Sequence, residues 1–235
     1  MSSVAVNGVD LSADHLGALY WQAERTLIVA DMHLEKGSAF ASRGQMLPPY
    51  DSAATLAKLN QLIARHRPKR LIALGDSFHD IQAGERMDKD CALALAALAA
   101  SLEMIWITGN HDPEIPTALS GQRYADYRLG GLVFRHEPLA GLQPGEIAGH
   151  LHPVARLVSP KGGIQARAFI SDGTRLLMPA FGSYAGGLNC RDDAISSLFN
   201  PHLMAAHICG STRVYPVKGN RLVSGEKQAS HMRVR

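Results

Sequence analysis

Carboxylate, amide and imidazole side chains recur between residues 31 and 152, and each group follows a short apolar run that is typical of a strand. A lone Asp-x-His or Gly-Asp pair is common in ordinary loops. Five groups in the same position relative to successive apolar runs are difficult to assign to chance, and together they predict one shared site. The groups are Asp31-Met32-His33, Gly75-Asp76, Gly109-Asn110-His111-Asp112, His136 and Gly149-His150-Leu151-His152.

These residue types fit a pair of divalent ions. Asp31 and His33 are two residues apart and can face the same ion, and a carboxylate such as Asp76 can bridge two ions. Mixed nitrogen and oxygen ligands suit manganese, iron, zinc or cobalt better than calcium or magnesium. Two divalent ions keep a positive charge after two carboxylates and a bridging hydroxide are counted. We therefore expect a phosphate oxygen to bind there and the bridging hydroxide to attack the phosphorus.

The predicted elements explain how these groups could meet. Buried strands are expected at 27–30, 70–74 and 103–108, with helices at about 51–67 and 88–101 between them. This order predicts a parallel sheet, and such sheets bind ligands at the carboxyl ends of their strands. Short apolar segments after residue 122 predict a second, more antiparallel sheet. Residues 32–50 are predicted to form a long functional loop.

Length and composition predict one globular domain. At 235 residues the chain can bury a core without disulfides. We assign residues 1–217 to the domain and 218–235 to a polar, disordered tail. No apolar run reaches the roughly 20 residues of a membrane span, and no secretory signal is visible. Three widely spaced cysteines without a CxxC motif indicate a reducing, cytoplasmic location. A net charge of +3 suits a polyanionic substrate but is low for a dedicated nucleic-acid clamp.

The ordered set D-x-H, G-D, G-N-H-D, H and G-H-x-H resembles the signature of the calcineurin-like metallophosphoesterases over residues 27–152. The resemblance implies an α/β fold, with two sheets between helical layers in an αββα sandwich and a dinuclear site at the carboxyl ends of strands. It also implies that His111 is the acid that protonates the leaving oxygen or stabilises the transition state, and that Asp112 could orient it. The implied ligands are Asp31, His33, Asp76 and His152 for one metal and Asp76, Asn110, His136 and His150 for the other.

Longer segments extend the resemblance to about residue 217. They resemble the bacterial ligase-associated DNA-damage-response endonucleases, which are found beside an ATP-dependent DNA ligase and a DEXH helicase. That family implies manganese-dependent cleavage of single-stranded DNA or small phosphodiesters, with the ligase and helicase as partners. The segments are HLEKGSAFASRGQMLPPYD (33–51), LGDSFHD (74–80), FRHEP (134–138) and MPAFGSYAGGLN (178–189).

Several residues outside the metal motifs are further candidates for substrate contacts. Lys36 and Arg43 could bind phosphates next to the scissile one, and His79 and Asp80 could orient metal ligands. The basic cluster at 65–70 is expected on the side opposite the metals. Four aromatic side chains could stack on bases, although several are expected in the core. They are Tyr50, Phe78, Phe181 and Tyr184.

Two alternatives to a nuclease remain open on sequence grounds. The first is a phosphatase or diphosphatase that acts on a nucleotide or another small phosphoester. The second is a non-catalytic scaffold that recruits ligase and helicase, although such a scaffold would be expected to lose metal ligands. The sequence does not specify the native substrate, the physiological metal or the oligomeric state.

Overall fold

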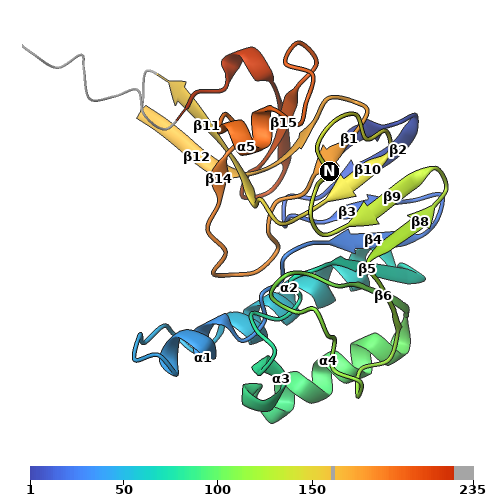
Figure 1. Cartoon of the computed structure of the whole chain (residues 1–235), viewed down its shortest axis with the longest axis vertical. Helices are drawn as coiled ribbons and strands as arrows, with labels where there is room; N and C mark the ends of the chain where they lie inside the picture. The colour runs from blue at the N-terminus through green and yellow to red at the C-terminus, as the bar shows by residue number, and fades with distance from the viewer. Residues whose placement is uncertain (160–161, 225–235) are drawn as a thin grey trace, which may run out of the picture.

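Two β-sheets pack against each other at the centre of the molecule (Figure 1). The computed structural model describes residues 1–159 and 162–224. The first sheet has seven strands in the order in which they occur along the chain. The pairs from β1 to β4 are antiparallel, whereas β4, β5, β6 and β7 are parallel neighbours. The strands are β1 (Ser2–Val6), β2 (Val9–Ala13), β3 (Leu19–Trp21), β4 (Thr26–Val29), β5 (Arg70–Leu74), β6 (Glu103–Ile107) and β7 (Gln122–Tyr124).

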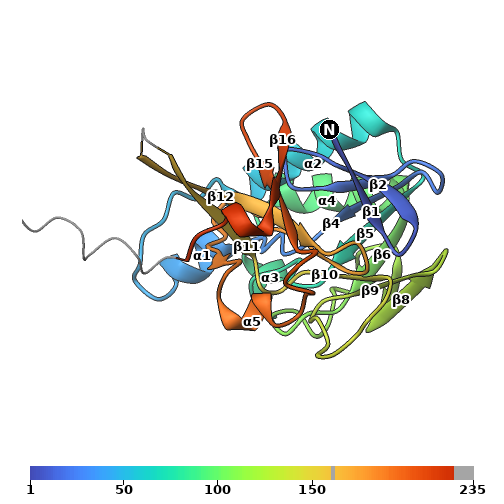
Figure 2. The same ribbon diagram turned by 90° about the horizontal axis from the view of Figure 1, so that it is seen from above.

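The second sheet is mixed and has the order β14-β11-β12-β13-β10-β9-β8, with β15 paired to β12 and β16 paired to β15. Seen from above, β11 and β12 extend beyond the other strands (Figure 2). β10 lies between β9 and β13 and is parallel to both. The strands are β8 (Asp126–Leu129), β9 (Leu132–Arg135), β10 (Glu146–Ala148), β11 (Pro153–Ser159), β12 (Gly162–Ser171), β13 (Leu176–Leu177), β14 (Leu188–Asn189), β15 (Ala205–Cys209) and β16 (Val214–Lys218).

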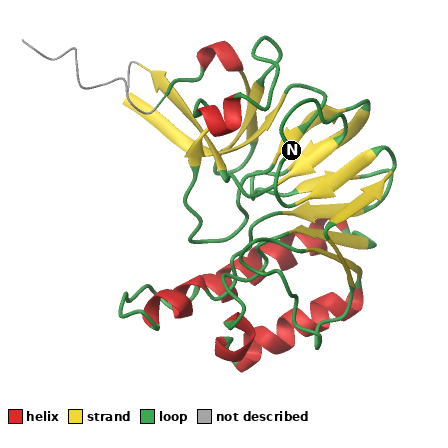
Figure 3. Ribbon diagram, viewed as in Figure 1, coloured by secondary structure: helices red, strands yellow, loops and turns green. Residues whose placement is uncertain are grey.

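Helices cover the outer faces of both sheets, mostly that of the first (Figure 3). Of the helices in the described part of the chain, α2 has 16 residues, and none is long and apolar enough to cross a membrane. The long α2 and α4 pack on the first sheet, and α5 packs on the second. The helices are α1 (Lys36–Ala41), α2 (Asp51–His66), α3 (Ala83–Arg86), α4 (Lys89–Ser101) and α5 (Asp193–Ser196), with a 3₁₀ turn η1 (Gly219–Arg221).

The alternation of side chains along the parallel strands creates three core layers. Ile28, Ile72 and Ile105 face the second sheet, where they meet Phe134 and Ile147. Their chain neighbours point the other way and pack under α2 and α4. A third cluster fills the space between the second sheet and α5. The order helix, sheet, sheet, helix confirms the predicted αββα sandwich.

The predicted elements around the motifs are close to the observed ones, with one difference in the loop at 32–50. Strand β5 matches its predicted bounds, and α2 begins at Asp51 as expected. The predicted loop at 32–50 contains α1, which the sequence pattern did not reveal. A hydrogen bond from the Gly37 amide to Asp51 Oδ2, 2.9 Å long, holds the first turn of α1 against the start of α2.

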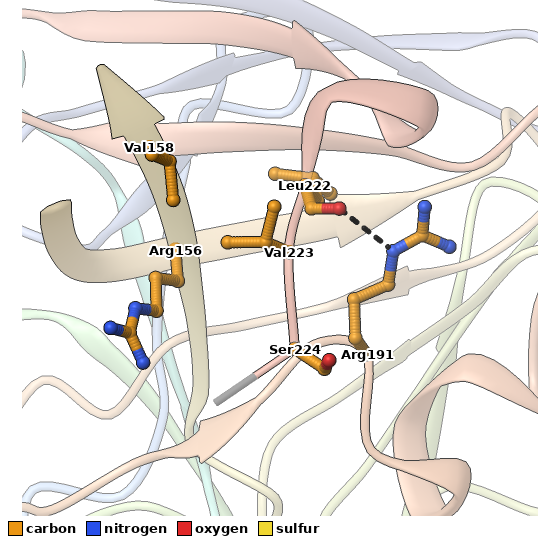
Figure 4. A pocket seen from close by; sticks show the side chains of 6 residues that line it. All are labelled: Arg156, Val158, Arg191, Leu222, Val223 and Ser224. Atoms are coloured by element: carbon orange, nitrogen blue, oxygen red, sulfur yellow. Dashed lines mark hydrogen bonds between the residues drawn. The ribbon is translucent and has the colours of Figure 1, made fainter. Parts of the chain in front are cut away.

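The predicted tail begins too early. Strand β16 ends at Lys218, and Leu222 is 4% exposed in the core of the second sheet. Arg191 donates from Nε to the Leu222 carbonyl at 3.3 Å and from Nη2 to the Gly219 carbonyl at 2.7 Å. Residues 222–224 also line a hollow of about 410 Å³ with Arg191 (Figure 4). The domain therefore continues to residue 224, and the rest of the predicted tail, 225–235, lies outside the described residues.

Candidate metal centre

All seven predicted metal ligands follow strands whose carboxyl ends meet at one edge of the two sheets. Those of the first sheet follow β4, β5 and β6, and those of the second follow β9 and β10. Because β4, β5 and β6 are parallel neighbours, as are β9 and β10, the loops after them lie side by side. The residues are Asp31, His33, Asp76, Asn110, His136, His150 and His152.

Asp31, His33 and His152 form the first ligand group. His152 Nε2 lies 3.2 Å from His33 Nε2 and 3.3 Å from Asp31 Oδ1. Both carboxylate oxygens of Asp31 accept the backbone N–H of His150 at 3.1 Å, which fixes the carboxylate across the gap between the sheets. Asp76 approaches this group with Oδ2, which is 3.8 Å from His33 Nε2.

The second group contains Asp76, Asn110, His136 and His150, with His136 Nε2 at its middle. This nitrogen is 3.0 Å from Asn110 Oδ1, 3.1 Å from His150 Nδ1 and 3.4 Å from Asp76 Oδ1. The other ring nitrogen of His136, Nδ1, lies 3.0 Å from the Leu74 carbonyl. Asp76 thus presents one oxygen to each ligand group, as expected for a bridging carboxylate.

This arrangement fits two cations. In the neutral ring of His136, a hydrogen bond from Nδ1 to the Leu74 carbonyl leaves the lone pair of Nε2 directed at Asn110 Oδ1 and Asp76 Oδ1, which are both acceptors. Without a metal, a proton on Nε2 is the cation at this position. Lone pairs that converge at about 3 Å repel one another unless a cation lies between them. The same separation is found between neighbouring ligands of an ion that is bound at about 2.1 Å. The two ligand groups therefore match the chemistry and spacing of a dinuclear site.

The electrostatics of the groups also favour cations. Burial lowers the pKa of His33 to about 3, so that its ring is neutral, as metal binding requires. Burial opposes ionisation of Asp76, but the hydrogen bond and charge of His136 outweigh it and hold the pKa of Asp76 at about 2. Burial likewise opposes protonation of His136, yet Asp76 and Asp31 raise its pKa to about 9. The carboxylates thus create a potential that draws positive charge to this position.

The backbone at the ligands is strained. Nine non-glycine residues in the described part of the chain have positive φ, and five of them are predicted ligands. Each costs roughly 1–2 kcal/mol relative to the ordinary conformation. Such a concentration at one edge of the sheets is typical of a functional site. The five residues are Asp31, His33, Asp76, His150 and His152.

His111 lies beside the centre and is oriented by the backbone. Its Nδ1 is 2.8 Å from the carbonyl of His79, which fixes the tautomer with the proton on Nδ1 in the neutral ring. Nε2 faces Asp76 Oδ2 at 4.0 Å, and the side chain is 40% exposed. A ring that is held at one nitrogen and accessible at the other is suited to exchange a proton with a bound substrate.

Asp112 does not orient His111, contrary to the prediction. Its buried carboxylate accepts four backbone N–H groups, from Asp76, Ser77, Phe78 and Gly109, over distances of 2.7–3.1 Å. Asp112 therefore joins the loop after β5 to the loop after β6. The sequence could not reveal this role, because the four donors are main-chain groups in two separate loops.

Gly75 gives a direct test of how His136 is positioned. Its φ is +69°, and a Cβ at this position would lie 2.4 Å from the His136 ring. We expect Gly75→Ala to displace His136 and to weaken manganese binding by roughly 10–100-fold, as measured by titration calorimetry. Gly44→Ala is the matched control, because Gly44 also has positive φ (+78°) but no atom within 4 Å of the added Cβ. Equal losses in both variants would show that backbone strain, rather than contact with His136, is responsible.

The structure separates the other candidate residues. Phe78 and Phe181 are core residues at 3% and 0% exposure and cannot stack on bases. Tyr50 is 69% exposed at the start of α2, and the Tyr184 hydroxyl donates to the Pro48 carbonyl at 2.9 Å.

The sequence pattern gave only a weak indication that Gly182 supports the site. The Gly182 amide donates to the Asp31 carbonyl at 3.0 Å. A Cβ there would lie 2.3 Å from the Met32 carbonyl, so the strand-end turn requires glycine.

The basic cluster at 65–70 is away from the metal centre, as predicted. It joins the end of α2 to the amino end of β5, whereas the ligands follow the carboxyl ends. Two of its arginines are also neutralised. Arg65 pairs with Asp14 at 2.6 Å, and Arg70 pairs with Glu103 at 2.8 Å.

Comparison with known proteins identifies the family. The model of the calcineurin-like phosphoesterase family matches residues 24–220, so the chain belongs to this family and is a metal-dependent phosphoesterase. With the ligand set complete and convergent, the non-catalytic scaffold is not supported. No curated protein sequence matches the chain significantly.

The solved structure of a bacterial nuclease shows the same fold. The chain is similar to the nuclease MPE of Pseudomonas putida, with 28% identity, a TM-score of 0.70 and coverage of 92% of this chain and 99% of the nuclease. The phosphoesterase YfcE of E. coli has 15% identity and a TM-score of 0.42, covering 82% of this chain and 98% of its own. A conserved uncharacterised protein of Streptococcus pneumoniae has 12% identity and a TM-score of 0.30, with 86% and 92% covered.

Proposed function

We propose that the protein is a manganese-dependent phosphodiesterase that cleaves single-stranded DNA internally and acts in DNA repair. The observation that carries the proposal is the near full-length similarity to a nuclease, at 28% identity over 92% of the chain. The mixed nitrogen and oxygen ligand set supports manganese, although iron, zinc and cobalt satisfy the same preferences. A DNA ligase and a DEXH helicase remain predicted partners, and a cytoplasmic location remains a prediction.

The residues of the centre have distinct roles in the proposed reaction. Divalent ions would be held by Asp31, His33, Asp76, Asn110, His136, His150 and His152, and would acidify a water molecule and withdraw charge from the phosphate. Asp31 and Asp76 neutralise part of the charge of the ions, and Asn110 contributes an uncharged oxygen. The centre would therefore keep a net positive charge that attracts the substrate phosphate. His111 is protonated at Nε2 in its acidic form and delivers that proton to the leaving oxygen. The hydrogen bond from His111 Nδ1 to the His79 carbonyl orients the ring so that Nε2 faces the centre.

The test of this function compares substrates with poor and activated leaving groups. Wild-type protein loaded with manganese should cleave labelled single-stranded DNA and bis-p-nitrophenyl phosphate. We expect His111→Ala to keep both metals and to lose roughly 10²–10⁴-fold in DNA cleavage, because an alkoxide needs a proton to leave. The loss on bis-p-nitrophenyl phosphate should be below about tenfold, since nitrophenolate leaves without protonation.

His202→Ala is the control for removal of an imidazole, because His202 is exposed and lies outside both ligand groups. Equal losses on the two substrates in His111→Ala would count against a proton-donor role. Hydrolysis of only monoesters or dinucleoside polyphosphates by the wild type would reject the nuclease and favour the phosphatase or diphosphatase alternative.

A further inference from the structure

A half-buried lysine without an ionic partner lies next to the metal centre. Lys36 begins α1, three residues after His33, and its Nζ is 5.9 Å from the centroid of the Phe40 ring. Within residues 1–159 and 162–224 no carboxylate oxygen lies within 4.0 Å of Lys36 Nζ, and the more distant charge of Asp51 offsets its burial only in part. Nearby Arg86, in contrast, is neutralised by Asp80 at 2.7 Å. Partial burial lowers the pKa of Lys36. A half-buried cation without a partner is unfavourable, which suggests that a ligand supplies the anion.

The ring of His79 lies on the same side of the centre. Its centroid is 5.2 Å from the His111 ring and 5.6 Å from the His33 ring. His79 is 9% exposed, and its buried Nδ1 has no hydrogen-bond partner in the described part of the chain. The Phe40 ring connects the two residues, because its centroid is 5.9 Å from Lys36 Nζ and 5.8 Å from the His79 ring. Lys36 and the His79 ring therefore lie on the same side of the metal centre.

The flank beside the second ligand group is acidic instead. A hollow of about 310 Å³ borders Asn110, and its lining includes Asp126 and Glu137. Arg135 also lines this hollow, but Asp126 at 2.7 Å and Glu146 at 3.4 Å neutralise its guanidinium. A second phosphate would be repelled there and attracted on the Lys36 flank.

We propose that Lys36 and His79 form an anion subsite that binds the phosphate next to the scissile one in a phosphodiester chain. This proposal rests on the nuclease function proposed above, because it takes the second phosphate to be the next one along a nucleic-acid strand. Lys36 supplies a charge-assisted hydrogen bond, and His79 supplies an imidazole N–H. Arg43, which is exposed after α1, adds positive charge on the same flank.

The test uses trinucleotides that differ only in the charge of one phosphate. Trithymidylate has two phosphates, and replacing either one with an uncharged methylphosphonate leaves the other cleavable. We expect both methylphosphonate isomers to have a KM roughly tenfold above that of trithymidylate in the wild type, because neither offers a charged neighbour. The bond of trithymidylate that is cut first reports which side of the scissile phosphate the subsite serves.

Variants of Lys36 test whether the subsite causes the lower KM for trithymidylate than for its methylphosphonate isomers. Lys36→Met keeps the packing on Phe40 and should raise the KM for trithymidylate roughly tenfold, to the level of the isomers, while leaving the isomers and bis-p-nitrophenyl phosphate unchanged. Lys36→Arg should restore most of the preference. Lys69→Met is the matched control, because Lys69 lies before the amino end of β5 and away from the metal ligands.

The outcomes separate the subsite from the proposed function. Equal KM values for the three trinucleotides in the wild type would overturn the subsite alone, as would an equal loss on every substrate in Lys36→Met. A wild type that hydrolyses bis-p-nitrophenyl phosphate but cleaves neither trinucleotides nor single-stranded DNA would overturn the nuclease function and the subsite with it.

Discussion

Asp76→Ala should abolish metal binding and turnover on every phosphoester substrate. Asp76 presents Oδ2 at 3.8 Å from His33 Nε2 and Oδ1 at 3.4 Å from His136 Nε2, so its loss removes a ligand from both groups. Without a pair of ions, the centre loses several kcal/mol of transition-state stabilisation. This corresponds to a fall in kcat/KM on the order of 10³-fold or more. Metal analysis after manganese loading and steady-state kinetics on bis-p-nitrophenyl phosphate measure the two effects.

The control for Asp76→Ala is Asp80→Ala in the same loop. Asp80 pairs with Arg86 at 2.7 Å and is in neither ligand group, so this variant should bind two manganese ions and retain most activity. An Asp76→Ala protein that bound two ions and kept its kcat within tenfold of the wild type would contradict the bridging role.

Asp112→Asn should destabilise the fold and weaken the metal centre together. The four backbone N–H groups that donate to Asp112 lie 2.7–3.1 Å away, and the carboxylate is buried at 1% exposure. An asparagine directs an NH₂ group at some of these donors. We expect a loss of about 3 kcal/mol in the free energy of unfolding, which lowers Tm by roughly 6–12 °C for a chain of this size. Thermal unfolding in EDTA measures this loss apart from metal binding.

Manganese affinity of Asp112→Asn should also fall by roughly 10–100-fold, because the two loops that Asp112 joins carry Asp76 and Asn110. Asp88→Ala is a control for losing a carboxylate that accepts backbone N–H groups. Asp88 caps α4 at the surface through the amides of Asp90 and Cys91, and its removal should cost only about 1 kcal/mol. A normal Tm for Asp112→Asn, with only an altered pH profile of activity, would instead support the role in orienting His111.

The convergence of the candidate ligands could be predicted because it depends on local patterns. An apolar run followed by Asp31 or Asp76 indicates a buried strand, and the aspartate marks the carboxyl end of that strand. The parallel order of β4, β5 and β6 then brings these ends together without further information. The same reasoning placed His136 and His150 after β9 and β10, although it did not predict that these two strands are parallel neighbours.

The features that were missed depend on contacts between distant parts of the chain. α1 has six residues and begins with Lys36 and Gly37, which form no helical repeat, and a bond from the Gly37 amide to Asp51 stabilises it. Phe181 is buried because its amide donates to the Ala30 carbonyl at 2.8 Å, which draws its loop into the core. The His79 carbonyl that fixes His111 has no signature in sequence at all, because any residue could provide it.

The left-handed backbone at the ligands has a consequence for how related sequences can change. Asp31, His33, Asp76, His150 and His152 each hold a conformation that glycine adopts freely and asparagine tolerates. Selection for stability alone would therefore favour glycine at these positions, and only the need for metal ligands opposes it. In a relative that has abandoned catalysis, we expect these five positions to be among the first to drift, and to drift toward glycine or asparagine rather than alanine. The identity of the replacement would then distinguish a retired active site from one that has acquired a different metal.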